Sequence, residues 1–308
     1  MRFLITGGAG FIGSNIARQL VDKGYSVRIL DNFATGQRSN LDGLENDIDL
    51  VEGDIRDFWT VVKATKGIDY ILHQAALPSV PRSIDNPLTT TEVNINGTLN
   101  LLEAARYNNV QRMVYASSSS VYGDSPVMPK EETMKTMPKS PYAITKLAGE
   151  EYCMNFYALY GLETVAIRYF NVFGPRQNPF SQYSAVIPKF ITMMKQGKRP
   201  TIHGDGLTSR DFTFIDNVVN ANILACEKKD AAGNVVNVAC NKAYTLNDLV
   251  EKLNNIMGLD IEPIHGPEKK GDVKHSLADI SKAKELLKYD VLVDFDEGLK
   301  KTVEWYAK

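Results

Sequence analysis

Three observations in the 308 residues predict an α/β protein, with a doubly wound parallel sheet and a smaller mixed α/β lobe. First, residues 1–31 read as strand, glycine-rich turn, helix and strand. Second, short apolar runs alternate with helical periodicities up to about residue 170, which is typical of parallel strands joined by crossover helices. Third, this rhythm ends after Asn171, so we expect a second lobe to begin there.

The first strand and helix enclose a glycine-rich turn. Residues 2–6 form a short apolar strand, and Gly7, Gly10 and Gly13 follow at a spacing of three before a helical stretch over 14–23. Glycine tolerates the dihedral angles of a tight turn, and it lets helix and strand pack closely. It also leaves the first helical amides open to a pyrophosphate. The turn therefore predicts a Rossmann-type dinucleotide site, against the alternative of a glycine-rich turn without a ligand.

An aspartate, Asp31, stands at the end of this strand–turn–helix–strand unit. Asp31 follows the second apolar strand over 27–30, where its carboxylate would accept hydrogen bonds from a ribose diol. The same charge would repel a 2′-phosphate, so the sequence favours NAD over NADP.

The third and fourth strands end in candidate cofactor contacts. Residues 49–53 lead to Asp54, which we expect near an adenine ring or as the cap of a helix over 58–65. Residues 69–74 lead to Ala75 and Ala76, which are small enough for a dinucleotide to cross the sheet edge. The Ser- and Pro-containing stretch 78–87 is predicted to be an active-site loop, and helical spacing follows over 89–108.

A serine cluster follows the fifth strand. Residues 111–116 read as a strand, and four serines occupy 117–120, where ligands sit in open α/β sheets. Each serine alone could equally belong to a polar turn. Ser140 and Pro141 then predict the start of a helix that runs to about residue 160, and a sixth strand follows over 163–170.

The predicted division of the chain places the dinucleotide-binding domain at 1–169, with 214–239 returning to it. The smaller lobe takes 170–213 and 240–308. The elements expected after residue 170 are a helix over 184–196, a strand over 201–203, a helix over 216–225, a strand over 234–238, a helix over 245–257 capped by Thr245, and a terminal helix over 296–306; those at 216–225 and 234–238 fall in the part that returns to the dinucleotide-binding domain.

Tyr142 and Lys146 are the candidate chemical groups. They lie one helical turn apart, so both project from one face of the helix. An ammonium and a nicotinium ring beside the phenol could lower its pKa by roughly three units, which needs about 4 kcal/mol. The alternative is an ordinary surface pair, which the glycine-rich turn upstream disfavours.

Composition excludes several function classes. The formal charge of −2 gives no basic excess for nucleic acid, and Cys153, Cys226 and Cys240 have no paired spacing. The four histidines form no metal-ligand cluster, so no metal is expected. No signal peptide or membrane span is predicted, which makes a cytoplasmic protein the default expectation.

The turn T-G-G-x-G-x-x-G and the pair Tyr-x-x-x-Lys resemble the extended short-chain dehydrogenase/reductase family. The chain is most similar to its NAD-dependent UDP-hexose 4-epimerases, especially the UDP-N-acetylglucosamine 4-epimerase branch. The matching stretches are HQAALPSVPRS (73–83), SSSSVYG (117–123), SPYAITK (140–146), RYFNVFGPRQNP (168–179), GDGLTSRDFTFID (204–216) and GDVKHSLADISKAKELL (271–287).

The resemblance implies roles residue by residue. The catalytic set is Ser118, Tyr142 and Lys146, with Ser118 bonded to the reacting hydroxyl. The cofactor-binding set is Gly7, Gly10, Phe11, Ile12, Gly13, Asp31, Asn32, Gly36, Asp54, Ile55, Ala75, Ala76, Asn94, Ser117, Tyr142, Lys146 and Tyr169. The substrate-binding set is Ser79, Ser118, Ser119, Tyr142, Asn171, Arg210, Asp272 and Ser276.

Three substrate residues carry specific expectations. Arg210 is the predicted diphosphate clamp, because a guanidinium binds phosphate bidentately; an ion pair with a neighbouring aspartate is the alternative. Asn171 matches a diphosphate contact and Asp272 a uridine ribose contact. Ser276 matches a gatekeeper position, where a small side chain leaves room for an N-acetyl group. The chain has Lys269-Lys270 where the family usually has Arg-Glu, so the second clamp loses its planar fork.

The resemblance implies reversible C4 epimerisation of UDP-hexoses through a 4-keto sugar, with tightly bound NAD. UDP-GlcNAc/UDP-GalNAc and also UDP-Glc/UDP-Gal are the expected substrates. Related dehydratases carry Asp-Glu after the catalytic Ser/Thr, whereas this chain has Ser119 and Ser120, which cannot act as acids or bases at neutral pH. A UDP-glucuronate 4-epimerase or related enzyme stays open as an alternative, and so does a non-catalytic NAD sensor. A homodimer through 89–108 and 142–160 is a further expectation.

Overall fold

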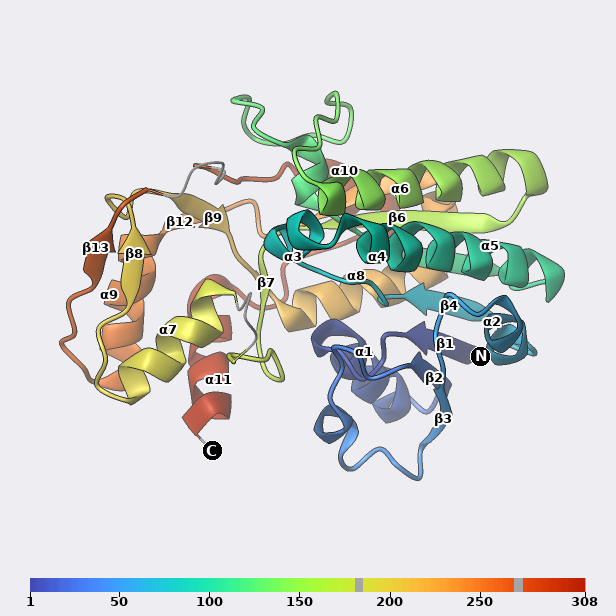
Figure 1. The fold of residues 1–308 in the computed structure, drawn as a ribbon, viewed down its shortest axis with the longest axis horizontal. Helices are drawn as coiled ribbons and strands as arrows, with labels where there is room; N and C mark the ends of the chain where they lie inside the picture. Colours follow the sequence, from blue (N-terminus) through green and yellow to red (C-terminus); the bar gives the residue numbers. More distant parts are fainter. Residues whose placement is uncertain (181–184, 269–273, 308) are drawn as a thin grey trace.

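The computed structural model describes residues 1–180, 185–268 and 274–307. Its centre is a parallel sheet of seven strands in the order β11-β6-β5-β4-β1-β2-β3 (Figure 1). The strands are β1 (Arg2–Thr6), β2 (Ser26–Asp31), β3 (Ile48–Glu52), β4 (Tyr70–His73), β5 (Arg112–Ser118), β6 (Glu163–Tyr169) and β11 (Asn234–Val238). The predicted doubly wound α/β fold is confirmed, and all seven carboxyl ends lie at one edge.

Helices cover both faces of the sheet (Figure 1). One face packs against α1 (Phe11–Asp22) and α8 (Ile215–Glu227), and the other packs against α2 (Phe58–Thr65), α5 (Gly97–Tyr107) and α6 (Pro141–Tyr160). Apolar strand residues are therefore buried on both sides, as in other parallel sheets. The predicted cap of α6 is confirmed, because the Ser140 side chain accepts a hydrogen bond from the Ala143 amide.

Two segments differ from their predictions. The stretch 78–87 contains a short helix, α3 (Val80–Asp85), because Ser79 caps it and its proline lies in the first turn, where no amide donor is needed. The helix expected over 89–108 is split into α4 (Pro87–Thr91), a π-helical turn η2 (Glu92–Asn96) and α5. Asp57 caps α2, so the capping role considered for Asp54 was wrong.

The second lobe is built from short strand pairs and three longer helices (Figure 1). Thr245 caps α9 within a capping box, as predicted. The elements are β7 (Val172–Phe173), α7 (Val186–Lys195), β8 (Thr201–His203), β9 (Ser209–Asp211), β10 (Thr213–Phe214), β12 (Ala243–Thr245), α9 (Leu246–Met257), β13 (Ile264–Gly266), α10 (Ser281–Leu287) and α11 (Phe295–Ala307). Elsewhere in the chain, short 3₁₀ turns follow β2, β5 and α8, at η1 (Arg38–Leu41), η3 (Ser119–Tyr122) and η4 (Lys229–Ala231).

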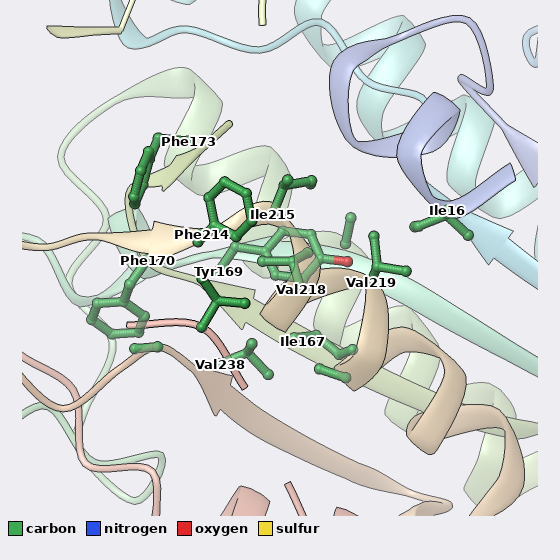
Figure 2. Close-up of a cluster of buried hydrophobic side chains, with 14 of the residues drawn as sticks. Ile16, Ile167, Tyr169, Phe170, Phe173, Phe214, Ile215, Val218, Val219 and Val238 are labelled. Carbon is green, nitrogen blue, oxygen red and sulfur yellow. The ribbon is translucent and has the colours of Figure 1, made fainter. Parts of the chain in front are cut away.

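One buried cluster joins the sheet to this lobe. Figure 2 shows one cluster that extends from Ile167 of β6 past Val218 of α8 to Phe214 and Phe173, which belong to the paired strands β10 and β7. The Phe173 ring also contacts Phe295 of α11, with 5.6 Å between centroids. The lobe therefore shares its core with the sheet, and the division of the chain into 1–169 with 214–239 and a remainder stays a prediction.

Candidate active site

The glycine turn lies at the carboxyl end of β1. Gly7 has a φ of +69°, which L-residues rarely adopt, and a Cβ on Gly13 would lie 2.2 Å from the Gly7 carbonyl oxygen. Gly10 caps α1 without a side-chain hydrogen bond. Phe11 and Ile12 begin the helix, so their amides belong to its unpaired positive end. This open helix start fits the pyrophosphate of a dinucleotide.

Asp31 lies beside this turn. Its carboxylate accepts hydrogen bonds from the Ala9 amide at 2.9 Å and from the Phe33 amide at 2.8 Å. A Cβ on Gly36 would lie 3.0 Å from the Asp31 Oδ2, so only glycine allows this close approach without displacing a neighbour. Burial raises the pKa of Asp31, and the two amides oppose that rise. Lone pairs remain on the carboxylate for a ribose diol.

Replacing Asp31 tests the choice of dinucleotide. We expect Asp31→Asn to lower the affinity for NAD by roughly 10–100-fold, because hydrogen bonds to a charged group are lost. The measurement is the NAD content of the purified protein and the dissociation constant of added NAD. Asp49→Asn on the neighbouring strand β3 is the matched control, since Asp49 pairs only with Arg28 in the described structure. Equal NAD content in the two variants would contradict this role.

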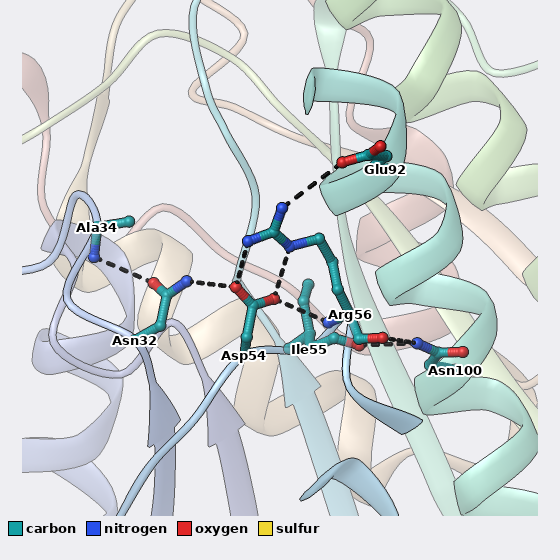
Figure 3. A network of polar contacts seen from close by, with 7 residues as sticks. All are labelled: Asn32, Ala34, Asp54, Ile55, Arg56, Glu92 and Asn100. Carbon is teal, nitrogen blue, oxygen red and sulfur yellow. Dashed lines mark hydrogen bonds and ion pairs between the residues drawn. The ribbon is translucent and has the colours of Figure 1, made fainter. Parts of the chain in front are cut away.

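Asp54 and Asn32 belong to a polar network at the ends of β2 and β3 (Figure 3). Asn32 donates to Asp54 at 2.8 Å, and Arg56 binds the same carboxylate at 2.8 Å. These contacts, the Arg56 hydrogen bond above all, lower the pKa of Asp54 to about 2. Arg56 also pairs with Glu92 at 3.6 Å, and both residues line a cavity of about 490 Å³ together with Asp54, Asp57 and Asn96. The sequence did not reveal Arg56 as the partner of Asp54.

Asn94 holds the segment that follows β4, just beyond Ala75 and Ala76. Its side chain accepts from the Leu77 amide at 2.8 Å and donates to the Thr145 hydroxyl at 3.0 Å. The π-helical turn directs it there, since a regular helix would rotate the side chain elsewhere. Asn94 thus fixes the loop after β4 to α6, next to Lys146.

Ser118, Tyr142 and Lys146 come together where β5 ends and α6 begins. The Ser118 hydroxyl lies near enough to the Tyr142 phenol to lower its pKa, and it accepts a hydrogen bond from the Ser120 amide at 3.2 Å. The Lys146 Nζ donates to the Ala116 carbonyl oxygen at 2.7 Å and lies 5.9 Å from the centre of the Tyr142 ring. An ammonium at this distance favours the phenolate form.

Burial sets the protonation of the pair. It raises the pKa of Tyr142, and the nearby Ser118 hydroxyl counteracts this effect. It lowers the pKa of Lys146 to about 8, against which the negative charge of Glu150 acts. Lys146 therefore remains mainly protonated at neutral pH, and Tyr142 needs further positive charge beside it to act as a base.

A buried ion pair lies behind these residues. Glu150, one turn beyond Lys146, accepts from Arg168 Nη2 at 2.7 Å and Nε at 2.9 Å. Both side chains are at most 5% exposed. Ser117 also donates its hydroxyl to Glu150, although the resemblance assigned Ser117 to the cofactor. Sequence reasoning missed this pair; the spacing of Glu150 from Lys146 was the signal available.

Tyr169 ends β6 at the same edge. Its hydroxyl donates to Asn222 of α8 at 3.0 Å and lies 3.2 Å from the Gln74 side chain, so its polar atom is held within the protein. Ile55 is buried beneath the turn after β3.

Three of the predicted substrate residues, Asn171, Arg210 and Ser276, lie on the second lobe. Asn171, in a left-handed conformation with a φ of 36°, donates to the Asp211 carbonyl oxygen at 3.1 Å and to the Ser276 hydroxyl at 3.4 Å. Arg210 donates to the carbonyl oxygens of Ser209 and Lys274. The structure thus brings Asn171 and Ser276 together. Asp272, Lys269 and Lys270 lie outside the described residues.

Two further predicted substrate residues lie on the other side of the site. Ser79 caps α3 with a φ of 95°. Ser119 begins η3, directly after Ser118. Over the described parts of the chain, no group of His, Cys, Asp and Glu could hold a metal ion. Within the same residues, no helix is both long and apolar enough to cross a membrane.

A dinucleotide cradle beside a Ser-Tyr-Lys constellation defines the short-chain dehydrogenase/reductase class. Comparison with known proteins narrows this class: the chain belongs to the NAD dependent epimerase/dehydratase family, whose sequence profile matches residues 3–239. NAD is therefore the cofactor, and the open start of α1 and the Asp31 carboxylate fit it.

The chain is similar in sequence along nearly its whole length to three known UDP-sugar 4-epimerases, two of which have solved structures. A UDP-N-acetylglucosamine 4-epimerase of Methanobrevibacter ruminantium, solved with UDP-N-acetylmuramic acid, is 42% identical with a TM-score of 0.95, covering 99% of this chain and 98% of its own. A Thermus thermophilus UDP-glucose 4-epimerase solved with NAD is 34% identical with a TM-score of 0.91, covering 100% and 99%. A UDP-glucose 4-epimerase of Mycolicibacterium smegmatis is 37% identical over 310 residues, covering 99% and 98%.

Proposed function

We propose that this enzyme reversibly epimerises UDP-hexoses at C4, with UDP-GlcNAc and UDP-GalNAc as substrates and NAD held as a tightly bound group. UDP-glucose and UDP-galactose are also expected to react. One observation carries the proposal: Ser118, Tyr142 and Lys146 assemble beside the dinucleotide cradle, while serines occupy the next two positions after Ser118. That arrangement supports proton and hydride exchange at one carbon and offers no acid or base for elimination.

In this mechanism Tyr142 takes the proton of the sugar 4-hydroxyl and later returns it. Ser118 orients that hydroxyl, and Lys146 stabilises the phenolate. When bound, NAD accepts and returns the C4 hydride, and its positive ring adds to the charge of Lys146. The resulting 4-keto sugar has to expose its other face, so the protein must hold the diphosphate firmly and the sugar weakly. Asn171 and Arg210 are the residues proposed to hold the diphosphate.

Incubating the purified protein with UDP-GlcNAc and no added cofactor tests the proposal. We expect UDP-GalNAc to form, because NAD remains bound through purification. If UDP-GalNAc forms only after NAD is added, the proposal of tightly bound NAD is wrong, whereas the proposed C4 epimerisation still holds. If neither UDP-GlcNAc nor UDP-glucose reacts even with added NAD, the proposal that the enzyme epimerises these UDP-hexoses at C4 is wrong.

Ser276 is the proposed gate for the N-acetyl group. Its hydroxyl lies 3.4 Å from Asn171, next to the proposed diphosphate contact. We expect Ser276→Tyr to lower kcat/KM for UDP-GlcNAc by about 10–100-fold relative to UDP-glucose, because the phenol ring occupies the space of the acetyl group. Ser281→Tyr, at the exposed start of α10, is the matched control. An unchanged ratio of the two kcat/KM values would exclude this gate.

A UDP-glucuronate 4-epimerase is the second candidate. The observation that favours it is the Ser120 hydroxyl, which is buried, has no hydrogen-bond partner within the described residues and lies two residues from Ser118. A hydroxyl donor at this place could bind a carboxylate on the sugar. The same assay with UDP-glucuronate decides between the candidates.

A homodimer is proposed through 89–108 and 142–160, which the structure places in α4, η2, α5 and α6. Large apolar side chains are exposed on these segments, including Tyr107 at 71% and Leu159 at 65%. Exposed apolar side chains of this size are common in protein interfaces. Sedimentation of the purified protein tests the dimer, and a monomer at micromolar concentration would contradict it.

We propose that the enzyme acts in the cytoplasm.

A further inference from the structure

We infer that a second pocket, separate from the NAD and substrate sites, binds a small phosphate monoester. The pocket has a volume of about 300 Å³, at the lower end of the range for small-molecule sites. Its lining includes Arg18 of α1, Asn40 of η1, Arg176 and Gln177 after β7, and Trp305 of α11. We call it the Arg18/Arg176 pocket. Neither arginine has a role in the proposed epimerase reaction.

Two guanidinium groups line this pocket without a carboxylate. Arg18 donates to the carbonyl oxygens of Asn40 at 3.0 Å and Asp42 at 2.7 Å, and Arg176 donates to the Asn15 side chain at 2.9 Å. Among the described residues, neither arginine has a carboxylate oxygen within 4.0 Å, although, after backbone hydrogen bonds, the charge of Arg18 contributes to lowering the pKa of Glu45. Half-buried cations of like sign repel each other, so an oxyanion between them would be stabilised.

The electrostatics support an anion. Burial lowers the pKa of Arg176, and the positive charge of Arg18 lowers it further. The two cations therefore influence each other across the pocket. A phosphate dianion offers several acceptor oxygens and matches the planar fork of each guanidinium.

Unpaired polar atoms indicate the rest of the ligand. Arg18 Nε is a buried donor, and Gln177 Oε1 is a buried acceptor; neither has a partner within the described residues. Each atom has almost no exposed surface, so a ligand reaches it only when neighbouring side chains move; the donor then suits a phosphate oxygen, and the acceptor a hydroxyl or amine. The Trp305 side chain adds an apolar face. These features favour a phosphate monoester that carries hydroxyl groups, such as a sugar phosphate.

The pocket borders the dinucleotide cradle through Gln37 and Asn40, which both donate to the Ala9 carbonyl oxygen, and it extends along α1 away from the start of that helix. Arg18 lies seven residues after Phe11 on α1, which is about 10 Å along the helix axis at 1.5 Å per residue. The pocket joins α1 to α11, so a bound ligand would connect the sheet with the terminal helix.

Tryptophan fluorescence gives a direct test, because Trp59 and Trp305 are the two tryptophans of the sequence. In a Trp59→Phe background, Trp305 reports on the pocket; Trp59 itself is 67% exposed on α2. The protein keeps its NAD and is saturated with UDP, so that both proposed nucleotide sites are filled. Glucose 6-phosphate, inorganic phosphate and sodium chloride of equal ionic strength are then titrated.

We expect a saturable change of Trp305 emission with glucose 6-phosphate, and none with chloride. Arg176→Gln should weaken binding by roughly tenfold or more. Arg199→Gln is the control, because Arg199 is an exposed arginine that binds the carbonyl oxygens of Glu262 and Pro263 and does not line the pocket. Glucose 6-phosphate should bind more tightly than inorganic phosphate.

Three outcomes would overturn the inference. They are an emission change that does not saturate, equal affinity in Arg176→Gln and the control, and binding of inorganic phosphate alone. Because Arg18 also fixes main-chain carbonyls, Arg18→Gln could unfold the η1 segment; Arg18→Lys, which keeps the charge, should then retain part of the binding.

Discussion

Tyr142→Phe is expected to lower kcat by about 10²–10⁴-fold, which is the usual contribution of a positioned acid–base group. The variant keeps the ring and loses only the hydroxyl near Ser118. NAD content and unfolding temperature should remain close to those of the wild type, because the ring still fills its half-buried position. Initial rates with UDP-GlcNAc and the absorbance of bound NAD are the measurements.

Tyr152→Phe provides the control for this variant. Tyr152 belongs to the same helix, α6, but is 37% exposed on its outer face. We expect its activity to equal that of the wild type. If Tyr142→Phe retained full activity, Tyr142 could not be the acid–base group; if it lost activity together with its NAD, the role would be structural.

Lys146→Met is expected to abolish activity and, unusually for a change at a buried position, to stabilise the fold at pH 7. Burial lowers the pKa of Lys146 from 10.5 to about 8, a difference of 10.5 − 8 = 2.5. At roughly 1.4 kcal/mol for each pKa unit, the buried charge costs about 3 kcal/mol of folding free energy. Methionine fills a similar volume without the charge, although the hydrogen bond to Ala116 is lost.

The stabilisation expected from Lys146→Met depends on pH, because it reflects the cost of burying a charged lysine. A lysine with a lowered pKa in the folded state destabilises the fold fully below that pKa, and the penalty disappears as the pH rises from about 8 to 10.5. Urea unfolding at pH 7 and pH 10 should therefore show the advantage of Lys146→Met shrinking with pH. The exposed Lys300→Met on α11 is the control. A variant less stable than the wild type at pH 7 would show that burying the charge is not costly.

Local patterns explain what the sequence predicted well. The turn at Gly7 and the spacing of Tyr142 and Lys146 depend on dihedral angles and helical periodicity, which a few consecutive residues determine. The caps at Ser140 and Thr245 are equally local, and the structure contains both. The three prolines of 78–87 led to the prediction of a loop, which was wrong because a proline in the first turn is compatible with the helix α3.

Partners distant in the chain explain what the sequence did not predict. Glu150 meets Arg168 only because β6 lies next to β5, with Ser117 opposite Arg168 in the strand register. The π-helical turn that directs Asn94 departs from any regular periodicity, so no spacing reveals it. The shared core between sheet and second lobe, likewise, depends on how β7 and β10 pair.

Helix α6 presents Tyr142, Lys146 and Glu150 to the interior and exposes Ile144 and Leu159 on its outer side. It is one continuous helix of 20 residues, so its two sides cannot shift independently. A molecule that binds Ile144 and Leu159 on the outer surface therefore also affects the position and orientation of the Tyr142 phenol and the Lys146 ammonium. Changes in reaction rate can then originate at a surface that the sugar never reaches.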